Sequence, residues 1–162
     1  MRLPKLLAAL ENTVVWLGAV ALMLLGILIC VAVSSRLVGG VIRGNAEIGE
    51  MLIIVVASTS LLAATFSGAH PYVHMLVDRL SSRSRGRLIA LVTATAALFW
   101  AVVAWVNGKV TIENSSLVEH TELLRISLIP FRVVWVAALV AIALVLAIRA
   151  FKALSDRPSQ DT

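Results

Sequence analysis

The sequence predicts an all-α membrane protein with four transmembrane helices arranged as two hairpins. Three observations predict this fold class: a composition that is 60% hydrophobic and only 14% charged, four long apolar stretches, and an uneven distribution of basic residues between the segments that join them. Soluble domains typically have about a quarter of their residues charged, so most of this chain is expected to lie in lipid. We expect residues 1–154 to form a single four-helix transmembrane domain and residues 155–162 to form a disordered cytoplasmic tail.

The first three apolar stretches are long enough to cross the bilayer, since a helix needs about 20 apolar residues to cross about 30 Å of hydrocarbon. The fourth stretch is short, but it reaches this length if it begins near Ile126, with Pro130 in its first turn and Arg132 extending to the headgroups. Uninterrupted apolar residues occupy 12–35, 51–69, 88–108 and 133–148. With flanking residues included, the predicted spans are about 12–35, 48–70, 88–108 and 127–149.

Basic residues predict that both termini face the cytoplasm, where Lys and Arg accumulate in short loops. One side of the membrane is expected to carry nine of them: Arg2, Lys5, Arg79, Arg83, Arg85, Arg87, Arg149, Lys152 and Arg157. The other side carries five, Arg36, Arg43, Lys109, Arg125 and Arg132, and their charge is cancelled by Glu47, Glu50, Glu113, Glu119 and Glu122. The net charge of +5 therefore indicates topology rather than nucleic-acid binding.

A cleaved signal peptide is the alternative for the first stretch. Arg2 and Lys5 resemble a basic n-region, and residues 32–34 resemble a small-residue cleavage site. The apolar core is longer than the roughly 7 to 15 residues of a signal peptide, so we favour a permanent span. The single cysteine, Cys30, lies within this span and is interpreted as a packing residue.

Small residues at helical spacing predict where helices pack closely, because small side chains let backbones approach one another in a membrane. Three stripes are present: Gly26, Cys30 and Ser34; Ser60, Ala64 and Gly68; and Ala90, Ala94, Ala97, Ala101, Ala104 and Gly108. The third alternates steps of four and three, as in the seam of a left-handed helix pair. The alternative is that small residues are simply common in membrane helices.

A short interfacial helical segment is predicted after the second span. Pro71 interrupts the helix, and apolar side chains then recur at spacings of three and four: Val73, Leu76, Val77 and Leu80. This pattern is typical of a helix that lies on the membrane surface. His70 and His74 are four residues apart, but no third ligand is nearby, so we do not expect a metal site.

No catalytic residue, cofactor site or metal site is predicted. The middle third of every apolar stretch lacks an ionisable side chain, so the chain has no buried carboxylate for proton-coupled exchange. It also lacks the residue sets of membrane proteases and the histidines within the bundle that a haem requires. A support role is favoured over a free-standing adaptor or assembly factor, and a small autonomous carrier is the least favoured alternative.

Charged residues flank the connection between the first two spans. Arg36 ends the first span, and Glu47 and Glu50 open the second. An antiparallel hairpin is expected to bring these residues to a similar depth, where a reduced effective dielectric strengthens an ion pair. We therefore predict that Arg36 pairs with Glu50 or Glu47, with ordinary headgroup contacts as the alternative.

The chain resembles the DctQ family, the small membrane subunit of tripartite ATP-independent periplasmic (TRAP) transporters. The resemblance rests, in chain order, on Arg36, on Glu47 and Glu50, on Gly68 followed by residues 74–80, and on residues 126–130 at the start of the last span. The sequence departs from the family where Leu37 follows Arg36 in place of an aromatic residue, and where two residues separate the acids that are commonly adjacent.

The resemblance implies a multi-pass subunit of a bacterial inner membrane. A periplasmic solute-binding protein (DctP-like) captures an organic anion, and a large multi-span permease subunit (DctM-like) carries it by an elevator motion coupled to sodium. The small subunit then braces the immobile part of the permease, in contact with membrane lipids. We take Arg36, Glu47, Glu50, His74 and Asp78 as candidate structural or interface residues. The resemblance does not indicate the solute, because recognition of the solute lies in the other chains.

Overall fold

The computed structural model describes residues 3–67, 82–114 and 120–155. Within them the chain forms four α-helices: α1 (Leu3–Leu37), α2 (Asn45–Phe66), α4 (Ser82–Asn114) and α5 (Ile129–Ser155). Each contains a segment long and apolar enough to cross a membrane, which confirms the predicted all-α class with four such helices. The predicted interfacial segment and almost all of the predicted tail lie outside the described residues.

Three of the helices are longer than the predicted spans. α1 begins at Leu3 and α4 continues to Asn114, because a helix can continue into the headgroup region whereas an apolar pattern marks only the hydrocarbon. α5 begins at Ile129, with Pro130 in its first turn as expected. α2 differs, since it begins at Asn45 and ends at Phe66 instead of running from 48 to 70.

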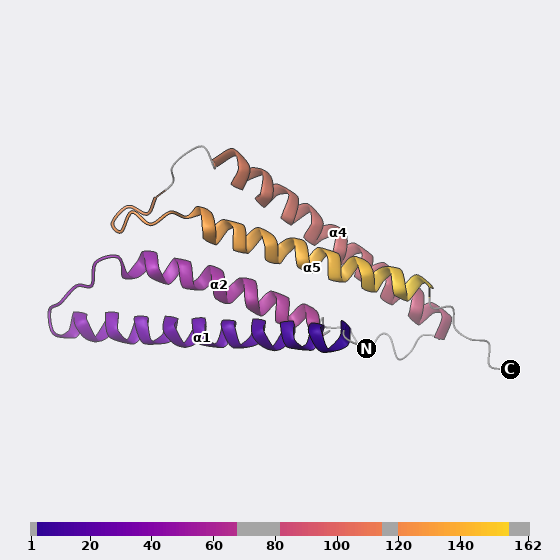
Figure 1. Cartoon of the computed structure of the whole chain (residues 1–162), viewed down its shortest axis with the longest axis horizontal. Helices are drawn as coiled ribbons and strands as arrows, with labels where there is room; N and C mark the ends of the chain where they lie inside the picture. The colour runs from indigo at the N-terminus through magenta and orange to yellow at the C-terminus, as the bar shows by residue number, and fades with distance from the viewer. Residues whose placement is uncertain (1–2, 68–81, 115–119, 156–162) are drawn as a thin grey trace.

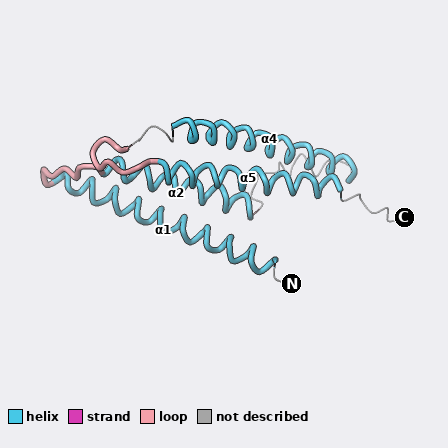
Figure 2. The backbone as a smooth tube through the Cα atoms, turned by 45° about the horizontal axis from the view of Figure 1, so that its top comes forward, coloured by secondary structure: helices cyan, strands magenta, loops and turns pink. Residues whose placement is uncertain are grey.

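The helices form two antiparallel hairpins that lie side by side (Figures 1 and 2). α1 packs against α2, α4 packs against α5, and the hairpins meet mainly where α2 contacts α5. We name the left end of the bundle in Figure 1, where α1 ends and α5 begins, the connection end. The opposite end, where α1 begins and α5 ends, is the terminal end.

α1 ends in a tight glycine turn at the connection end. The amide of Gly39 donates to the carbonyl of Arg36 at 3.1 Å, and the amide of Gly40 donates to the carbonyl of Ser35 at 2.8 Å. This pair of bonds is the Schellman motif that commonly ends a helix. Gly39 has a φ of 78°, which glycine adopts readily because it has no Cβ. The turn therefore stops α1 and returns the chain toward α2.

The tightest packing surrounds α5. Its most deeply buried side chains are Leu139, Ile142 and Leu146, with exposed fractions of 0%, 1% and 1%. Ile142 and Leu146 form a cluster with Ala97 of α4, and further side chains of both neighbouring helices pack on it: Leu61 and Leu62 of α2, and Ala96 and Trp100 of α4. α5 therefore lies at the centre of the bundle, where it contacts α4 of its own hairpin and α2 of the other hairpin.

The three small-residue stripes have different surroundings within this chain. Alternate members of the α4 stripe are buried: Ala90, Ala97 and Ala104. The members of the α1 stripe are exposed, and so are Ser60 and Ala64 of the α2 stripe. Close packing of α1 on α2 occurs instead at Gly18, where an added Cβ would lie 2.7 Å from Oγ1 of Thr59. Within this chain the pattern predicted packing correctly for α4. No described helix covers the α1 stripe or Ser60 and Ala64, and Gly68 lies outside the described residues, so close packing at these two stripes stays a prediction.

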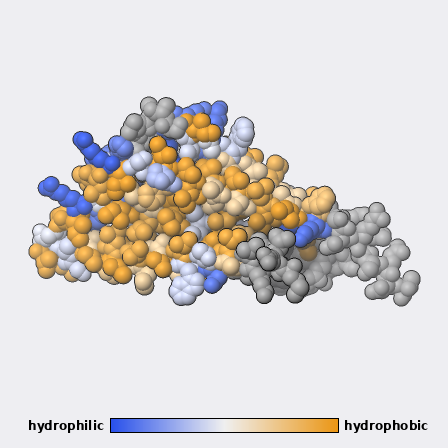
Figure 3. Space-filling view, in the orientation of Figure 1, coloured by the Kyte–Doolittle hydropathy of each residue, from blue (hydrophilic) through white to orange (hydrophobic). Residues whose placement is uncertain are grey.

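Much apolar surface remains uncovered, as the space-filling view shows (Figure 3). Of the α1 side chains whose burial the structure describes, only Ala21 and Ala32 are buried. The end of α1 and the connection after it also expose large apolar side chains: Leu37, Val38 and Val41. Apolar surface of this extent is covered by lipid or by another protein in a stable assembly.

Candidate functional site

Glu47 joins the two hairpins at the connection end. It lies in the first turn of α2, and its carboxylate accepts two backbone hydrogen bonds from the segment that precedes α5. The N–H of Leu123 donates to Oε1 at 2.7 Å, and the N–H of Leu124 donates to Oε2 at 3.0 Å. Hydrogen bonds to an ionised acceptor are stronger than those between neutral groups. The carboxylate therefore holds this segment against the start of α2.

The segment that provides these amides is a closed turn, which we name the 120–127 turn. Its ends form an antiparallel bridge between His120 and Ser127. Thr121 is buried, and its hydroxyl accepts the N–H of Ile126 at 3.0 Å. The N–H of Thr121 in turn donates to the carbonyl of Ile126 at 3.0 Å. These bonds lie within the turn, so they hold its closed shape without a contribution from α2.

Leu124 of the same turn packs against the residue that precedes α2. Gly44 is buried and has a φ of 79°, a conformation that favours glycine. An added Cβ at Gly44 would lie 2.8 Å from Cγ and Cδ1 of Leu124. The turn therefore contacts the start of α2 in two ways, by hydrogen bonds at Glu47 and by close apolar packing at Gly44.

A second contact, a hydrogen bond, joins the two hairpins at the terminal end. Arg149, near the end of α5, donates from Nη2 to the carbonyl oxygen of Phe66 at 2.9 Å. Phe66 is the last residue of α2, and the carbonyls of a final helical turn have no intrahelical donors. The guanidinium charge also interacts favourably with the negative end of the helix dipole. Arg149 thus caps α2 from the other hairpin.

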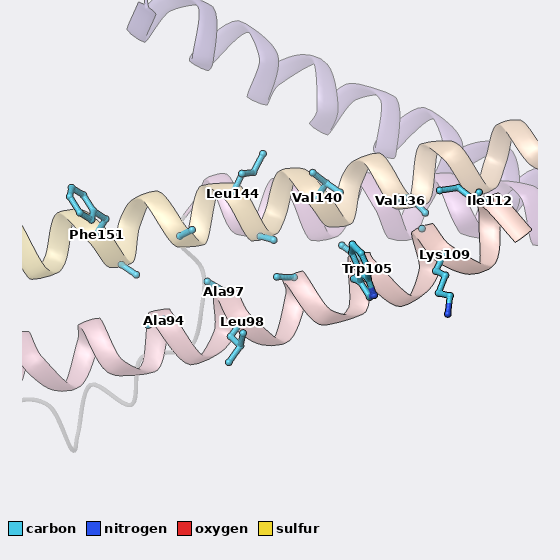
Figure 4. Close-up of a pocket in the computed structure, with 16 residues that line it drawn as sticks. Ala94, Ala97, Leu98, Trp105, Lys109, Ile112, Val136, Val140, Leu144 and Phe151 are labelled. Atoms are coloured by element: carbon cyan, nitrogen blue, oxygen red, sulfur yellow. The ribbon is translucent and has the colours of Figure 1, made fainter.

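An apolar groove of about 950 Å³ runs between α4 and α5 (Figure 4). Small residues line much of it: Ala94, Ala97, Ala101, Ala104 and Gly108 of α4, and Ala143, Ala147 and Ala150 of α5. Figure 4 shows Leu98 and Lys109 pointing away from α5, and Nζ of Lys109 lies 3.7 Å from Oε1 of Glu113. The groove suits an acyl chain or an apolar helix, because its lining offers almost no group that could bind a polar solute.

Arg36, Glu47 and Glu50 are all described by the structure, and no ion pair joins Arg36 to either acid. Arg36 and Glu50 are exposed, whereas the carboxylate of Glu47 is occupied by the two amides of the 120–127 turn. The pairing of Arg36 with Glu50 or Glu47 stays a prediction.

The register of the first hairpin explains this geometry. An added Cβ at Gly49 would lie 3.9 Å from both Cδ1 of Leu25 and Cδ2 of Leu28, so Gly49 faces the turn of α1 between these two residues. With a rise of about 1.5 Å per residue along each antiparallel helix, Arg36 lies roughly 10 Å further along the axis than Glu47. Arg36 and the two acids therefore do not lie at the same depth in this hairpin, although the predicted pairing assumes that they do.

The other predicted interface residues, His74 and Asp78, lie outside the described residues. In the parts of the chain that the structure describes, no group of three or more His, Cys, Asp or Glu side chains is placed to hold a metal ion.

Arg149 and the 120–127 turn were missed by sequence reasoning. An acid in the first turn of a helix and an arginine near the end of a helix are both signals for capping. Glu47 is such an acid in α2, and Arg149 is such an arginine in α5. The partners of these side chains are backbone groups, which every residue possesses. The sequence therefore indicates the charged half of each contact and leaves the other half unspecified.

The chain matches the protein family described as tripartite ATP-independent periplasmic transporters, DctQ component, over residues 24–156. The matched region includes the last 14 of the 35 residues of α1 and all of α2, α4 and α5. No curated protein and no solved structure matches the chain. The resemblance found in the sequence is confirmed: the chain belongs to the DctQ family, the small, non-catalytic membrane component of TRAP transporters.

Proposed function

We propose that this DctQ chain braces a large permease subunit during the sodium-coupled uptake of an organic anion. The name of the family implies a transporter of three components, and we take the other two to be a DctM-like permease and a DctP-like binding protein. In this division of labour the binding protein delivers the anion and the permease carries it. The DctQ chain supports the part of the permease that stays fixed.

The uncovered apolar surface of the helices supports this proposal. Only 6% of the most apolar window of α1 is buried, and the groove between α4 and α5 is lined by small apolar residues. Small residues let another helix approach closely in a membrane. Lys109 is the one charged side chain among the groove residues, so this surface is better suited to contact a protein than to conduct an anion.

We further propose that the connection end faces the periplasm of a bacterial inner membrane and that both termini are cytoplasmic, as the positive-inside rule indicates. The connection end would then offer exposed apolar side chains to the binding protein: Val38, Val41 and Leu123, which are 85%, 79% and 64% exposed. A membrane-impermeant reagent should label a cysteine at Arg125 from outside the cell and should not reach one at Thr162. Labelling of Thr162 from outside would contradict this orientation.

We propose that Arg36 forms its ion pair with one of the two acids of α2, either Glu50 or Glu47, when the transporter is assembled. Arg36→Glu should impair assembly or uptake, and Arg36→Glu combined with Glu50→Arg should restore part of it. If neither this double variant nor the one with Glu47→Arg restores activity, the pairing is wrong.

Purification of the tagged chain from its native membrane tests the central proposal. A large multi-span partner should accompany it, and uptake in reconstituted vesicles should require this chain, the permease and the binding protein together. Isolation without such a partner would favour the free-standing adaptor. Solute flux through vesicles that contain this chain alone would establish the autonomous carrier.

A further inference from the structure

We propose that Glu47 and Arg149 fasten the two hairpins at opposite ends, so that the four described helices move as one rigid body. The proposal concerns the contact between α2 and α5, because the hairpins meet mainly there. It depends only on contacts within this chain, and it holds whatever solute or permease the chain serves.

The hydrophobic effect does not hold the two hairpins together in lipid, because lipid tails are as apolar as leucine side chains, so van der Waals packing and hydrogen bonds must do so. The buried hydroxyls of α2 add no link either. Ser58, Thr59 and Thr65 each donate to a carbonyl of their own helix, on Ile54, Val55 and Leu61 respectively. The hydrogen bonds of Glu47 and Arg149 do cross from one hairpin to the other.

Both contacts join a charged side chain to backbone groups. Such bonds contribute more than bonds between neutral groups. The two bonds of Glu47 are exposed, and the bond of Arg149 is partly buried. Both also complement the dipole of α2, since Glu47 lies in its first turn and Arg149 binds its last carbonyl. α2 is therefore held by an anion of its own at one end and by a cation of α5 at the other.

The separation of the two contacts explains why a pair is needed. Glu47 and Phe66 are about 29 Å apart along α2 at a rise of about 1.5 Å per residue. With one contact broken, the hairpins can pivot about the other, so each contact controls the end at which it lies. At the connection end, the packing of Leu124 on Gly44 also opposes sliding.

Distances between spin labels on the full chain in lipid nanodiscs test the proposal. With Cys30 replaced by alanine, one label pair at Val33 and Val110 reports on the connection end, and a second pair at Leu17 and Leu91 reports on the terminal end. All four label positions are exposed. Glu47→Gln should broaden the first distance distribution and leave the second narrow. Arg149→Gln should do the reverse.

Hydrogen exchange supplies a second readout. Gln at position 47 replaces one acceptor oxygen with a donor, so one amide of the turn loses its partner. Exchange in a peptide that covers residues 120–127 should accelerate about ten- to a hundredfold, the factor expected for loss of a hydrogen bond to a charged group. Arg149→Lys keeps a charged donor and should retain part of the order at the terminal end.

Two matched variants serve as controls. Glu122→Gln removes a negative charge beside the same amides, and Lys152→Gln removes a positive charge from the same end of α5; both residues are exposed. Each should leave both distributions as in the unmodified chain. Unchanged distances in Glu47→Gln and Arg149→Gln would overturn the proposal, and so would equal broadening at both ends. If Glu47→Gln lost its helical content, Glu47→Asp, with a shorter reach, would take its place with the same expected results.

Discussion

α1 and α5 are both apolar enough to cross a membrane, yet the rest of the chain covers them to different extents. In the most apolar window of α1, 6% of the residues are buried, against 22% in that of α5. α1 packs on α2, whereas α5 packs on both α4 and α2. Apolar composition therefore places a helix in the bilayer without determining which neighbours it has there.

This difference in burial indicates that α1 and α5 have different roles in the subunit. α5 holds the bundle together through its buried face and through Arg149 at its end. α1 contributes mainly an outward surface, with one close approach to α2 at Gly18. Substitutions should therefore destabilise the isolated chain mainly through α5, and α1 should tolerate them except at that approach and at the buried Ala21 and Ala32.

The largest effect is expected from the same substitution made in both helices. Ile142→Ala in α5 removes a side chain that is 1% exposed, and its cavity should cost about 2 to 5 kcal/mol of unfolding free energy. Ile27 of α1 is 52% exposed, so Ile27→Ala should change stability by less than about 0.5 kcal/mol. Unfolding in mixed micelles measures both. Equal losses would abolish the contrast between the two helices.

Two glycines of the connection after α1 give the next largest effect. Gly39 and Gly44 have φ values of 78° and 79°, so alanine should cost about 1 to 2 kcal/mol at either position. At Gly44 the new methyl group also meets Leu124, which should raise the total to about 2 to 4 kcal/mol. Nothing lies within 4 Å of an added Cβ at Gly39. Thermal unfolding of the two variants should differ accordingly, and identical midpoints would show that the 120–127 turn yields to the methyl group.

A smaller effect tests the one close approach of α1. Gly18→Ala places a methyl group 2.7 Å from Oγ1 of Thr59 and should cost about 1 to 3 kcal/mol. Gly26 lies on the same helix with open space around it. Gly26→Ala should therefore be neutral or stabilising by up to about 1 kcal/mol, because alanine favours helices. If the two variants had the same unfolding free energy, α1 would not be held at Gly18.

The smallest effect is expected on the exposed side of α4. Lys109 and Glu113 form an ion pair between exposed side chains one helical turn apart. Lys109→Gln should cost no more than about 0.3 to 0.5 kcal/mol, and raising the salt concentration should remove the difference because exposed charges are screened. A loss that persisted in high salt would indicate that Lys109 has a structural role beyond this pair.

The sequence predicted the four helices because the cost of placing polar groups in hydrocarbon leaves a clear apolar pattern. The α4 stripe has a helix of this chain against its small residues, whereas no described helix covers the stripe of α1 or Ser60 and Ala64 of the α2 stripe. A stripe marks a surface that allows close approach. It does not identify the helix that approaches.

Glu47 shows the limit for the candidate site. Its charge and its place at the start of the second span were evident, and pairing with Arg36 was the simplest interpretation. The structure joins it instead to amides 76 and 77 positions later in the chain. Backbone amides have no signature in a sequence, and the axial offset of Arg36 depends on the packing register of α1 on α2, which composition does not encode.

The cap that Arg149 places on Phe66 has a consequence for how the protein is made. Synthesis proceeds from the amino terminus, so the first two helices enter the bilayer long before α5 exists. During that interval Glu47 and the carbonyl of Phe66 lack the partners that they have in the finished protein. The early hairpin must therefore persist on its own contacts, because the hydrogen bonds that join the two hairpins can form only after the rest of the chain has been made.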